Sequence, residues 1–214
     1  MNKLFTPPKF NLVRKIYKGK KIAVLDVGCG NNSPMVTKYW FPDCFYAGVD
    51  RDPYYNNSEE ALELIDQFFE IDLDDGNLDA IPNDTYDLII MTHIIEHLIE
   101  GDKVMVELIK KLKKGGHMYI EYPSFKSVKL PSMRGTLNFF DDDTHRRIYT
   151  QVELYNLFIK HDCHVVKGGT RRYWIFVLLT PIRMLWDLVR YRYVNGSVLW
   201  DLMGFAEYIL IRKK

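Results

Sequence analysis

The sequence predicts an α/β fold built on a doubly wound, mostly parallel sheet. Short apolar runs rich in β-branched and aromatic residues alternate along the chain with longer helical patterns. This alternation is typical of parallel strands joined by helices that cover the faces of a sheet. The 214 residues are enough for one domain with a substantial core. We therefore expect a single domain that spans residues 1–214.

Seven strands are expected from the apolar runs. The first run, "KIAVLDV", is followed directly by a glycine loop, and the last is "FAEYILIRKK". The expected strands span residues 21–27, 44–50, 67–73, 86–92, 116–123, 163–170 and 205–214. Their order favours five strand–helix units followed by two further strands.

Helices are expected over residues 9–18, 34–40, 101–116 and 150–161. Ser33 and Pro34 give an N-cap residue followed by proline at the first helical position. Thr150 and Glu153 have the spacing of a capping box. The segment 101–116 carries apolar residues on one face and ends in lysines and glycines, as expected at a helix C-terminus.

Charge and cysteine content exclude several classes of protein. The net charge of +1 supplies no overall field that would attract nucleic acid, so no nucleic-acid partner is expected. The three cysteines are odd in number and lack paired spacing, which argues against a disulfide framework and a cysteine zinc site. The N-terminal segment has no apolar core of signal-peptide length, and no stretch reaches the roughly 18 apolar residues of a membrane span. We expect a cytoplasmic protein.

The loop in "AVLDVGCGNNSP" follows the first strand, at the edge of the sheet where such folds bind ligands. Gly28 and Gly30 allow a sharp turn and a close approach of the backbone to a ligand. No lysine follows, which excludes a nucleotide-phosphate loop of the GxxxxGK type. Ser33 replaces the third glycine of a dinucleotide loop, and Asp26 suits a cation better than a pyrophosphate. An NAD(P)-binding oxidoreductase stays as an alternative.

"VLDVGCG" resembles the first motif of the class I S-adenosylmethionine-dependent methyltransferases, of the type 11-like group. The further motifs of that family follow in order over roughly residues 20–170: an acid at the end of the second strand, "EIDLDD", "YDLIIMTHIIEHL" and "LKKGGHMYIEYPS". The resemblance implies a Rossmann-like sheet of seven mostly parallel strands whose last strand is antiparallel. It implies S-adenosyl-L-methionine as cofactor.

The resemblance also assigns cofactor-binding residues. The methionine carboxylate suits the loop N–H groups and the helix N-terminus, and the paired ribose hydroxyls suit a carboxylate. Asp50 is implied at the ribose, and Asp72 and Leu73 are implied at the adenine. The full predicted set is Asp26, Gly28, Gly30, Asp50, Asp72, Leu73 and His93.

The string "HIIEH" at residues 93–97 matches the inverted zincin pattern, in which two histidines one helical turn apart bind zinc. That pattern needs a helix, whereas these residues follow directly on the strand 86–92. We therefore favour His93 and His97 as pocket-lining or capping residues. The acids Asp141–Asp143 are an alternative Mg²⁺ site, but adjacent acids are more often solvated, and no metal is expected.

The long segment 123–150 is predicted to form the acceptor side of the site. His145 is the candidate general base, because its ordinary pKa lies near neutrality, and Asp143 is predicted to orient it. The alternative is a purely structural Asp143–His145 turn. A similar D-x-T-H string occurs in methyltransferases that modify polysaccharides and small acceptors. We expect O-methylation of a small-molecule acceptor, a sugar or related metabolite.

A basic, aromatic insertion is expected at about residues 171–204, with a helix from Pro181. One face of that helix carries Arg183, Asp187 and Arg190, and the other carries apolar residues. A lid over the acceptor or a homodimer contact is favoured for residues 171–193. Peripheral contact with the inner membrane face is the alternative, and it would favour a lipid-linked acceptor. A non-catalytic cofactor-binding protein also stays open.

Overall fold

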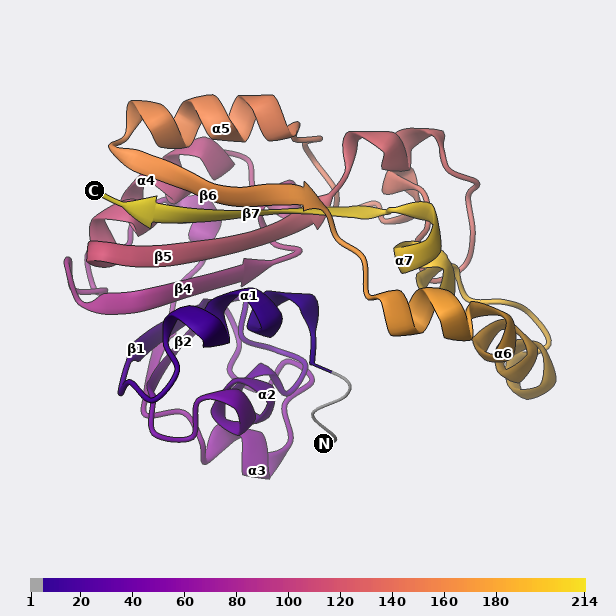
Figure 1. Cartoon of the computed structure of the whole chain (residues 1–214), viewed down its shortest axis with the longest axis horizontal. Helices are drawn as coiled ribbons and strands as arrows, with labels where there is room; N and C mark the ends of the chain where they lie inside the picture. Colours follow the sequence, from indigo (N-terminus) through magenta and orange to yellow (C-terminus); the bar gives the residue numbers. More distant parts are fainter. Residues whose placement is uncertain (1–5) are drawn as a thin grey trace.

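Seven strands form one sheet in the order β3-β2-β1-β4-β5-β7-β6 (Figure 1). This computed structural model describes residues 6–214. The strands are β1 Ala23–Val27, β2 Phe45–Asp50, β3 Gln67–Glu70, β4 Tyr86–Thr92, β5 Leu112–Pro123, β6 Cys163–Thr170 and β7 Ala206–Lys213. The pairs among β1–β5 are parallel, and β7 is antiparallel to both β5 and β6. The predicted fold class is confirmed.

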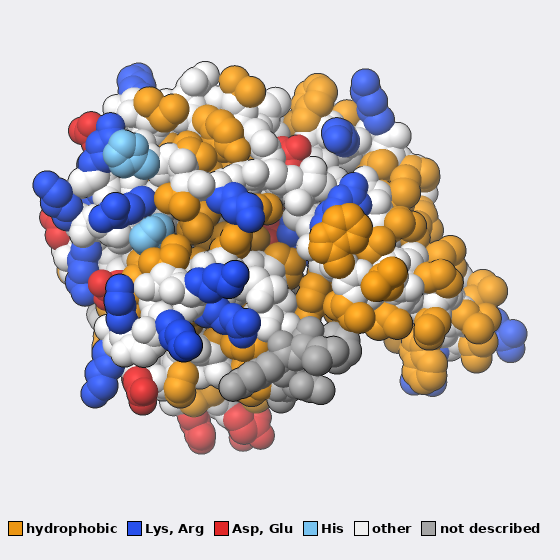
Figure 2. Space-filling view, in the orientation of Figure 1, with side chains coloured by type: hydrophobic (Ala, Val, Ile, Leu, Met, Phe, Trp, Pro, Cys, Tyr) orange, Lys and Arg blue, Asp and Glu red, His pale blue; other side chains and the backbone are white. Residues whose placement is uncertain are grey.

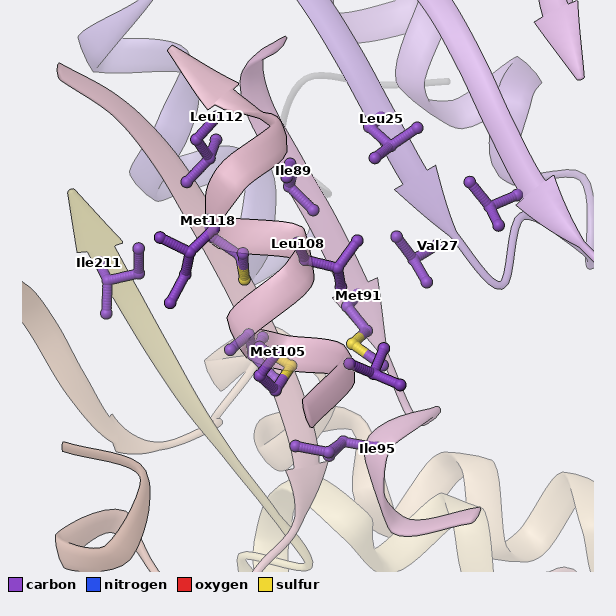
Figure 3. Close-up of a cluster of buried hydrophobic side chains, with 14 of the residues drawn as sticks. Leu25, Val27, Ile89, Met91, Ile95, Met105, Leu108, Leu112, Met118 and Ile211 are labelled. Atoms are coloured by element: carbon purple, nitrogen blue, oxygen red, sulfur yellow. The ribbon is translucent and has the colours of Figure 1, made fainter. Parts of the chain in front are cut away.

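Helices cover both faces of the sheet. They are α1 Pro8–Ile16, α2 Ser33–Trp40, α3 Glu59–Leu62, α4 Gly101–Lys111, α5 Gln151–Lys160, α6 Trp174–Tyr191 and α7 Trp200–Met203. Buried side chains of α1 pack with one set of strand residues, whereas those of α4 and α5 pack with the other set. Figure 3 shows part of the second cluster, in which Met105 and Leu108 of α4 lie against Ile89 and Met91 of β4.

Two of the predicted helix starts can be compared with the structure in detail. The capping box of Thr150 and Glu153 is present at the start of α5. The span of α2 agrees with the prediction, but its N-cap is Asn32, with φ +57°, and not Ser33. The Ser33 hydroxyl instead donates a hydrogen bond to Asp26, 2.5 Å away.

The prediction that the helix starting at residue 101 extends to residue 116 is wrong. Helix α4 ends at Lys111, and Leu112 already pairs with Tyr86 of β4. The Leu112 side chain is fully buried in the core. Packing of this leucine into the sheet therefore overrides the local helical pattern of the lysine-rich segment, and β5 begins four residues before the expected strand.

The topology brings four functional segments to one edge of the sheet. Strand β1 pairs with β2 on one side and with β4 on the other, so the order of strands reverses at β1. Strand β6 runs parallel to β5, because both are antiparallel to β7. The segment 171–205 between β6 and β7 therefore emerges at the same edge as the loops after β1, β2 and β4, and α6 projects from the molecule there (Figure 1).

Two expectations concern export and membrane insertion. The segment in which no export signal was expected includes residues 1–5, which lie outside the described residues. Over residues 6–214, no helix combines the length and the apolar character that a membrane crossing requires.

Candidate active site

The carboxyl edge of the sheet contains a pocket of about 840 Å³. Its walls come from the loops after β1, β2, β3 and β4, from residues near 145 and from α7. Seven residues singled out from the sequence line it: Gly28, Gly30, Asp50, Asp72, Leu73, His93 and His97. Asp26, Asp143 and His145 are not among the lining residues. Thr144 and Arg146, from the segment 123–150 that was predicted to form the acceptor side, also line it. Further lining residues, not singled out from the sequence, include Lys9, Tyr55 and Trp200.

Both predicted glycines of the β1 loop are required by close packing. Gly28 has φ +75°, and a Cβ atom there would collide with the side chain of Ile94. A Cβ atom on Gly30 would lie 2.8 Å from the carbonyl oxygen of Tyr55. The glycines therefore let the segment around Tyr55 and the β4 loop approach the β1 loop on two sides, and they keep the pocket floor free of side chains.

Asparagines hold the glycine loop in place, a role that the sequence analysis missed. The Asn32 N–H donates to the Asn57 side chain at 2.8 Å, and the Ser58 N–H donates to the Asn32 side chain at 2.7 Å. The Gly30 N–H has no hydrogen-bond partner among residues 6–214. This free donor lies in the pocket near the N-terminus of α2, where a carboxylate would be stabilised.

Asp26 lies beneath the glycine loop and not in the pocket. Its side chain is 1% exposed and accepts hydrogen bonds from Ser33 at 2.5 Å and from the Tyr46 hydroxyl at 2.8 Å. Burial raises the pKa of this carboxyl. The expected direct contact between Asp26 and a cationic ligand does not follow from this geometry, because both hydrogen bonds hold the carboxylate inside the protein.

Two acids and one apolar side chain in the pocket wall fit the adenosine part of the implied cofactor. Asp50 ends β2, and its Oδ1 accepts only from the Arg51 N–H, at 2.8 Å, within the described chain. Asp72 accepts from the Asp74 N–H at 3.0 Å, and Leu73 supplies apolar surface beside it. Asp50 therefore keeps a carboxylate oxygen for two hydroxyl donors, and the donor set fits a nucleoside.

His93 lines the pocket directly after the end of β4. Its backbone has φ +55°, and its ring nitrogens lie 3.2 Å from Glu96 Oε1 and 3.2 Å from Glu121 Oε1. Burial alone would lower the pKa of His93, but the hydrogen bonds to Glu121 and Glu96 raise it to about 9. The two carboxylates therefore favour the protonated form of His93 and make it a poor proton acceptor.

A buried chain of charges connects His93 to the insertion. Arg171 lies 3.0 Å from Glu121 and 2.7 Å from Asp201, and the Tyr119 hydroxyl donates to Glu121 at 2.8 Å. Burial would raise the pKa of Glu121, but these partners and His93 lower it to about 2. The sequence analysis missed this network, although an acid in the otherwise apolar "MYIEYP" is a visible signal.

The insertion contributes to the pocket through α7. Trp200 lies in the pocket wall, with its ring 5.2 Å from the ring of His93 and 4.5 Å from that of Phe205. The indole N–H donates to the carbonyl of Thr136 in the acceptor-side segment. This tryptophan therefore joins the insertion, the β4 loop and the acceptor-side segment.

Helix α6 turns its apolar face toward solvent, whereas an ordinary surface helix turns that face toward the protein core. It begins at Trp174, seven residues before the predicted start, and Pro181 lies inside it. Asp187 is buried and accepts from the Asn195 N–H at 2.9 Å. The apolar face points outward (Figure 2), with these side chains between 62 and 74% exposed: Trp174, Leu178, Ile182, Leu185, Trp186 and Val189.

His145 is buried under the acceptor side of the pocket. Its Nδ1 lies 2.6 Å from the carbonyl oxygen of Phe139, and its Nε2 lies 3.8 Å from Asp142 Oδ2. The prediction paired His145 with Asp143, but Asp142 is its acidic neighbour and Asp143 is exposed. The reason is an Asx turn: Asp142 Oδ1 accepts from the backbone N–H of Thr144 at 2.9 Å and from its hydroxyl at 2.5 Å.

Asp141 organises the same segment. Its carboxylate accepts from the N–H groups of Met133 at 3.0 Å, Leu137 at 2.9 Å and Asn138 at 2.8 Å, and from the Ser132 hydroxyl at 2.5 Å. Burial would raise the pKa of Asp141, but these bonds lower it to about 2. The alternative Mg²⁺ site at Asp141–Asp143 has little support, because the oxygens of Asp141 are already used.

The "HIIEH" string does not form a zincin helix. Residues Ile95–His97 form a 3₁₀ turn, and both ring nitrogens of His93 face carboxylates. His97 lines the pocket, and its Nδ1 lies 2.9 Å from the hydroxyl of Thr144. His93 and His97 therefore do not present a pair of free nitrogens to one ion.

Comparisons with known proteins agree with this architecture. A family model described as a methyltransferase domain matches residues 8–167. No curated protein matches the sequence. Solved structures match the fold, and at the identities below the likeness concerns the fold alone.

Three of these structures illustrate the likeness. A chain of the complex between the Haloferax volcanii Trm112 methyltransferase activator and a methyltransferase is 14% identical, with TM-score 0.67, over 99% of this chain and 90% of that chain. An S-adenosylmethionine-dependent methyltransferase from Mesorhizobium loti is 12% identical, with TM-score 0.62, over 96% of each chain. Coclaurine N-methyltransferase bound to N-methylheliamine and SAH is 13% identical, with TM-score 0.59, over 96% of this chain and 72% of that chain.

Proposed function

Since the chain belongs to the family of methyltransferase domains, we propose that it methylates an oxygen atom of a small-molecule acceptor, of the sugar or related metabolite class. The methyl donor is S-adenosyl-L-methionine, which supplies a methyl group already activated on a sulfonium. The observation that carries the proposal is one pocket whose lining combines the glycine loop, the acids Asp50 and Asp72 and the polar residues near Thr144. Within residues 6–214, the Gly30 N–H of that loop has no hydrogen-bond partner.

The cofactor side uses residues predicted from the sequence. Gly28 and Gly30 shape the loop, and the Gly30 N–H binds the methionine carboxylate, with Lys9 as a second positive group in the wall. Asp50 accepts from the ribose hydroxyls, and Asp72 and Leu73 hold the adenine side.

The acceptor is proposed to bind at the polar part of the pocket wall that the segment 123–150 and the turn after β4 form. His97, Thr144 and Arg146 line it and offer one imidazole, one hydroxyl and one guanidinium. Such groups recognise hydroxyl-rich or anionic small molecules by hydrogen bonding. Because transfer to a hydroxyl also requires removal of its proton, the cluster around His97 and His145 is the proposed position of proton removal.

The apolar face of α6 is proposed to bind a second copy of this chain. Apolar patches of this extent mark interaction sites on soluble proteins. A helix that lies on a membrane carries its basic residues on a solvent-facing polar side. Here Arg183 is turned inward, with its guanidinium 4.5 Å from the Phe176 ring centre, which favours a protein partner over a lipid surface.

The first test is calorimetric titration of the protein with S-adenosylhomocysteine, beside NADH. Micromolar binding of the thioether that is lost in Asp50→Ala and kept in Asp43→Ala supports the cofactor assignment. Asp43 is an exposed acid outside the pocket and is the matched control. Binding of NADH alone would overturn the proposal. Transfer of labelled methyl groups from the cofactor to fractionated sugars and sugar nucleotides then tests the acceptor class.

A further inference from the structure

We propose that Glu96, His97 and His145 bind one divalent transition-metal ion at the acceptor side of the pocket. One ligand atom from each residue lies within 4.8 Å of those of the other two. Glu96 and His97 belong to the turn after β4, and His145 belongs to the acceptor-side segment. The inference deepens the proposed function and rests on it, because the ion would act on the acceptor oxygen.

Both histidines are held so that Nε2 carries the lone pair. Nδ1 of His145 lies 2.6 Å from the carbonyl oxygen of Phe139, which accepts only, so Nδ1 is the protonated nitrogen. The hydroxyl of Thr144 donates to Asp142 at 2.5 Å and therefore accepts from Nδ1 of His97 at 2.9 Å. Metal-binding imidazoles are oriented in this way, by an oxygen that accepts from the other ring nitrogen.

Glu96 supplies the second, independent observation. Its side chain is buried, with 1% of the residue exposed, and Oε2 has no hydrogen-bond partner among residues 6–214. Its Oε1 is held by His93. A buried carboxylate oxygen without a partner is costly, and a bound cation would remove that cost.

The backbone brings His145 to Glu96. The carbonyl oxygen of Glu96 accepts from the N–H groups of Arg146 at 2.8 Å and Arg147 at 3.2 Å. These bonds fasten the acceptor-side segment to the turn after β4, at the residue that follows His145. The donor set is therefore assembled by main-chain hydrogen bonds that do not depend on the ion.

Two imidazoles and one carboxylate favour Zn²⁺, Co²⁺ or Mn²⁺ over Mg²⁺, which prefers six oxygens. Ligand atoms bound to one tetrahedral zinc at about 2.1 Å lie about 3.4 Å from one another. The three side chains, whose ligand atoms lie within 4.8 Å of one another, must therefore approach each other by up to about 1.4 Å on binding the ion. Asp142 Oδ2, 3.8 Å from His145 Nε2, is close enough to be a fourth ligand. Of these residues only His97 lines the pocket, so a substrate oxygen would reach the ion from the side of His97.

The chemistry follows from that approach of a substrate oxygen to the ion. An acceptor hydroxyl bound to the ion loses its proton to water more readily than a free hydroxyl. The bond from this oxygen to the methyl carbon forms as the bond from the methyl carbon to sulfur breaks. His93 takes no part in the ligand set, because both of its nitrogens are used by carboxylates. The proposed site thus differs from the expectation that the protein binds no metal. It pairs His97 with His145, whereas the zincin pattern would pair His97 with His93.

The test is calorimetric titration of the chelator-treated full chain with Zn²⁺, Mn²⁺ and Mg²⁺ salts, together with the visible spectrum after addition of Co²⁺. We expect one Zn²⁺ per chain, bound at least 100-fold more tightly than Mg²⁺. His97→Ala, His145→Ala and Glu96→Gln should each weaken Zn²⁺ binding at least 100-fold. His164→Ala, an exposed histidine on β6, is the matched control and should bind as the wild type does.

The outcomes separate the two proposals. Absence of stoichiometric Zn²⁺ binding, or equal loss in His164→Ala, would overturn the metal site. Since His97 is less buried than Glu96, His97→Ala carries the test if the glutamate variant fails to fold. Titration of the same samples with S-adenosylhomocysteine reports on the proposed function separately. Thioether binding without metal binding refutes only the metal site, whereas metal binding without thioether binding refutes the methyl-transfer proposal.

Discussion

Replacement of Gly28 by alanine should weaken cofactor binding through Ile94. Gly28 has φ +75°, so an alanine there costs about 1–2 kcal/mol of folding free energy from the left-handed backbone. Its methyl group would also collide with the side chain of Ile94, which lines the pocket. Displacement of Ile94 from its rotamer costs about 0.5–1.5 kcal/mol more.

Gly19→Ala is the matched control for this prediction. Gly19 has φ +71°, but a Cβ atom there meets nothing within 4 Å, so only the backbone cost applies. The difference between the two variants isolates the contact with Ile94. A ligand that has to push Ile94 back into place loses the same roughly 0.5–1.5 kcal/mol of binding free energy. This loss lowers the affinity of the protein for the ligand about 2- to 12-fold.

Calorimetric titration with S-adenosylhomocysteine and urea unfolding would measure the two quantities. Gly19→Ala should lose stability and keep its affinity, whereas Gly28→Ala should lose both. The double variant Gly28→Ala/Ile94→Ala should bind like Ile94→Ala alone, because the collision is gone. An affinity for Gly28→Ala equal to that of Gly19→Ala would refute the reasoning.

Three further predictions concern the surroundings of the site. Arg171→Met leaves the buried acids Glu121 and Asp201 without their cation and should cost about 3–5 kcal/mol in urea unfolding; a loss below 1 kcal/mol would contradict the buried charge network. Hydrogen bonds hold the pKa of Asp141 at about 2, below the value of about 4 in the unfolded chain. The contribution of this carboxylate to folding stability is therefore present above about pH 4 and is lost as the pH falls toward about 2. The free energy of unfolding of Asp141→Asn should depend less on pH between these values than that of the wild type. Trp186→Ser, at a side chain 68% exposed, should change the folding free energy by less than about 0.5 kcal/mol and reduce dimerisation in sedimentation equilibrium; an unchanged dimer fraction would exclude this face of α6 as the interface.

Most of the sheet could be predicted because its signals are local. Apolar runs marked every strand to within a few residues at one or both ends, and the capping box at Thr150 marked the start of α5. The end of α4 could not be predicted in the same way. It depends on the pairing of Leu112 with Tyr86, residues 26 positions apart, and no local pattern encodes that contact.

More of the pocket wall near the glycine loop than of the wall near the segment 123–150 could be predicted by residue, for the same reason. Gly28 and Gly30 lie in the loop after β1, and Asp50 is the last residue of β2, so the topology alone brings them to one edge. The sequence could place Asp26 near the loop, but it could not show that two hydroxyls would hold its carboxylate inside the protein. Contacts that join Glu121 to Arg171 and Trp200 to Thr136 span 50 or more residues and became visible only in three dimensions.

The identity of the acid beside His145, Asp142 or Asp143, shows a finer limit of prediction from the sequence. Both acids are close enough in sequence to reach His145, and spacing does not distinguish them. The Asx turn at Thr144 decides the matter, because it turns one acid inward and leaves the other in solvent. Turn geometry of this kind depends on a few hydrogen bonds that composition does not report.

The junction between β6 and β7 makes the insertion an exchangeable part of the enzyme. Thr170 lies directly opposite Glu207 in the antiparallel pair, so the chain leaves the sheet and re-enters it at neighbouring positions. Evolution can lengthen, shorten or replace the segment between them without moving a strand. Retention of Arg171, which anchors the segment to Glu121, keeps any replacement aligned with the pocket. Under the proposed function, a change of acceptor would therefore require changes in this one segment only, while the loops after β1, β2 and β3 stay as they are.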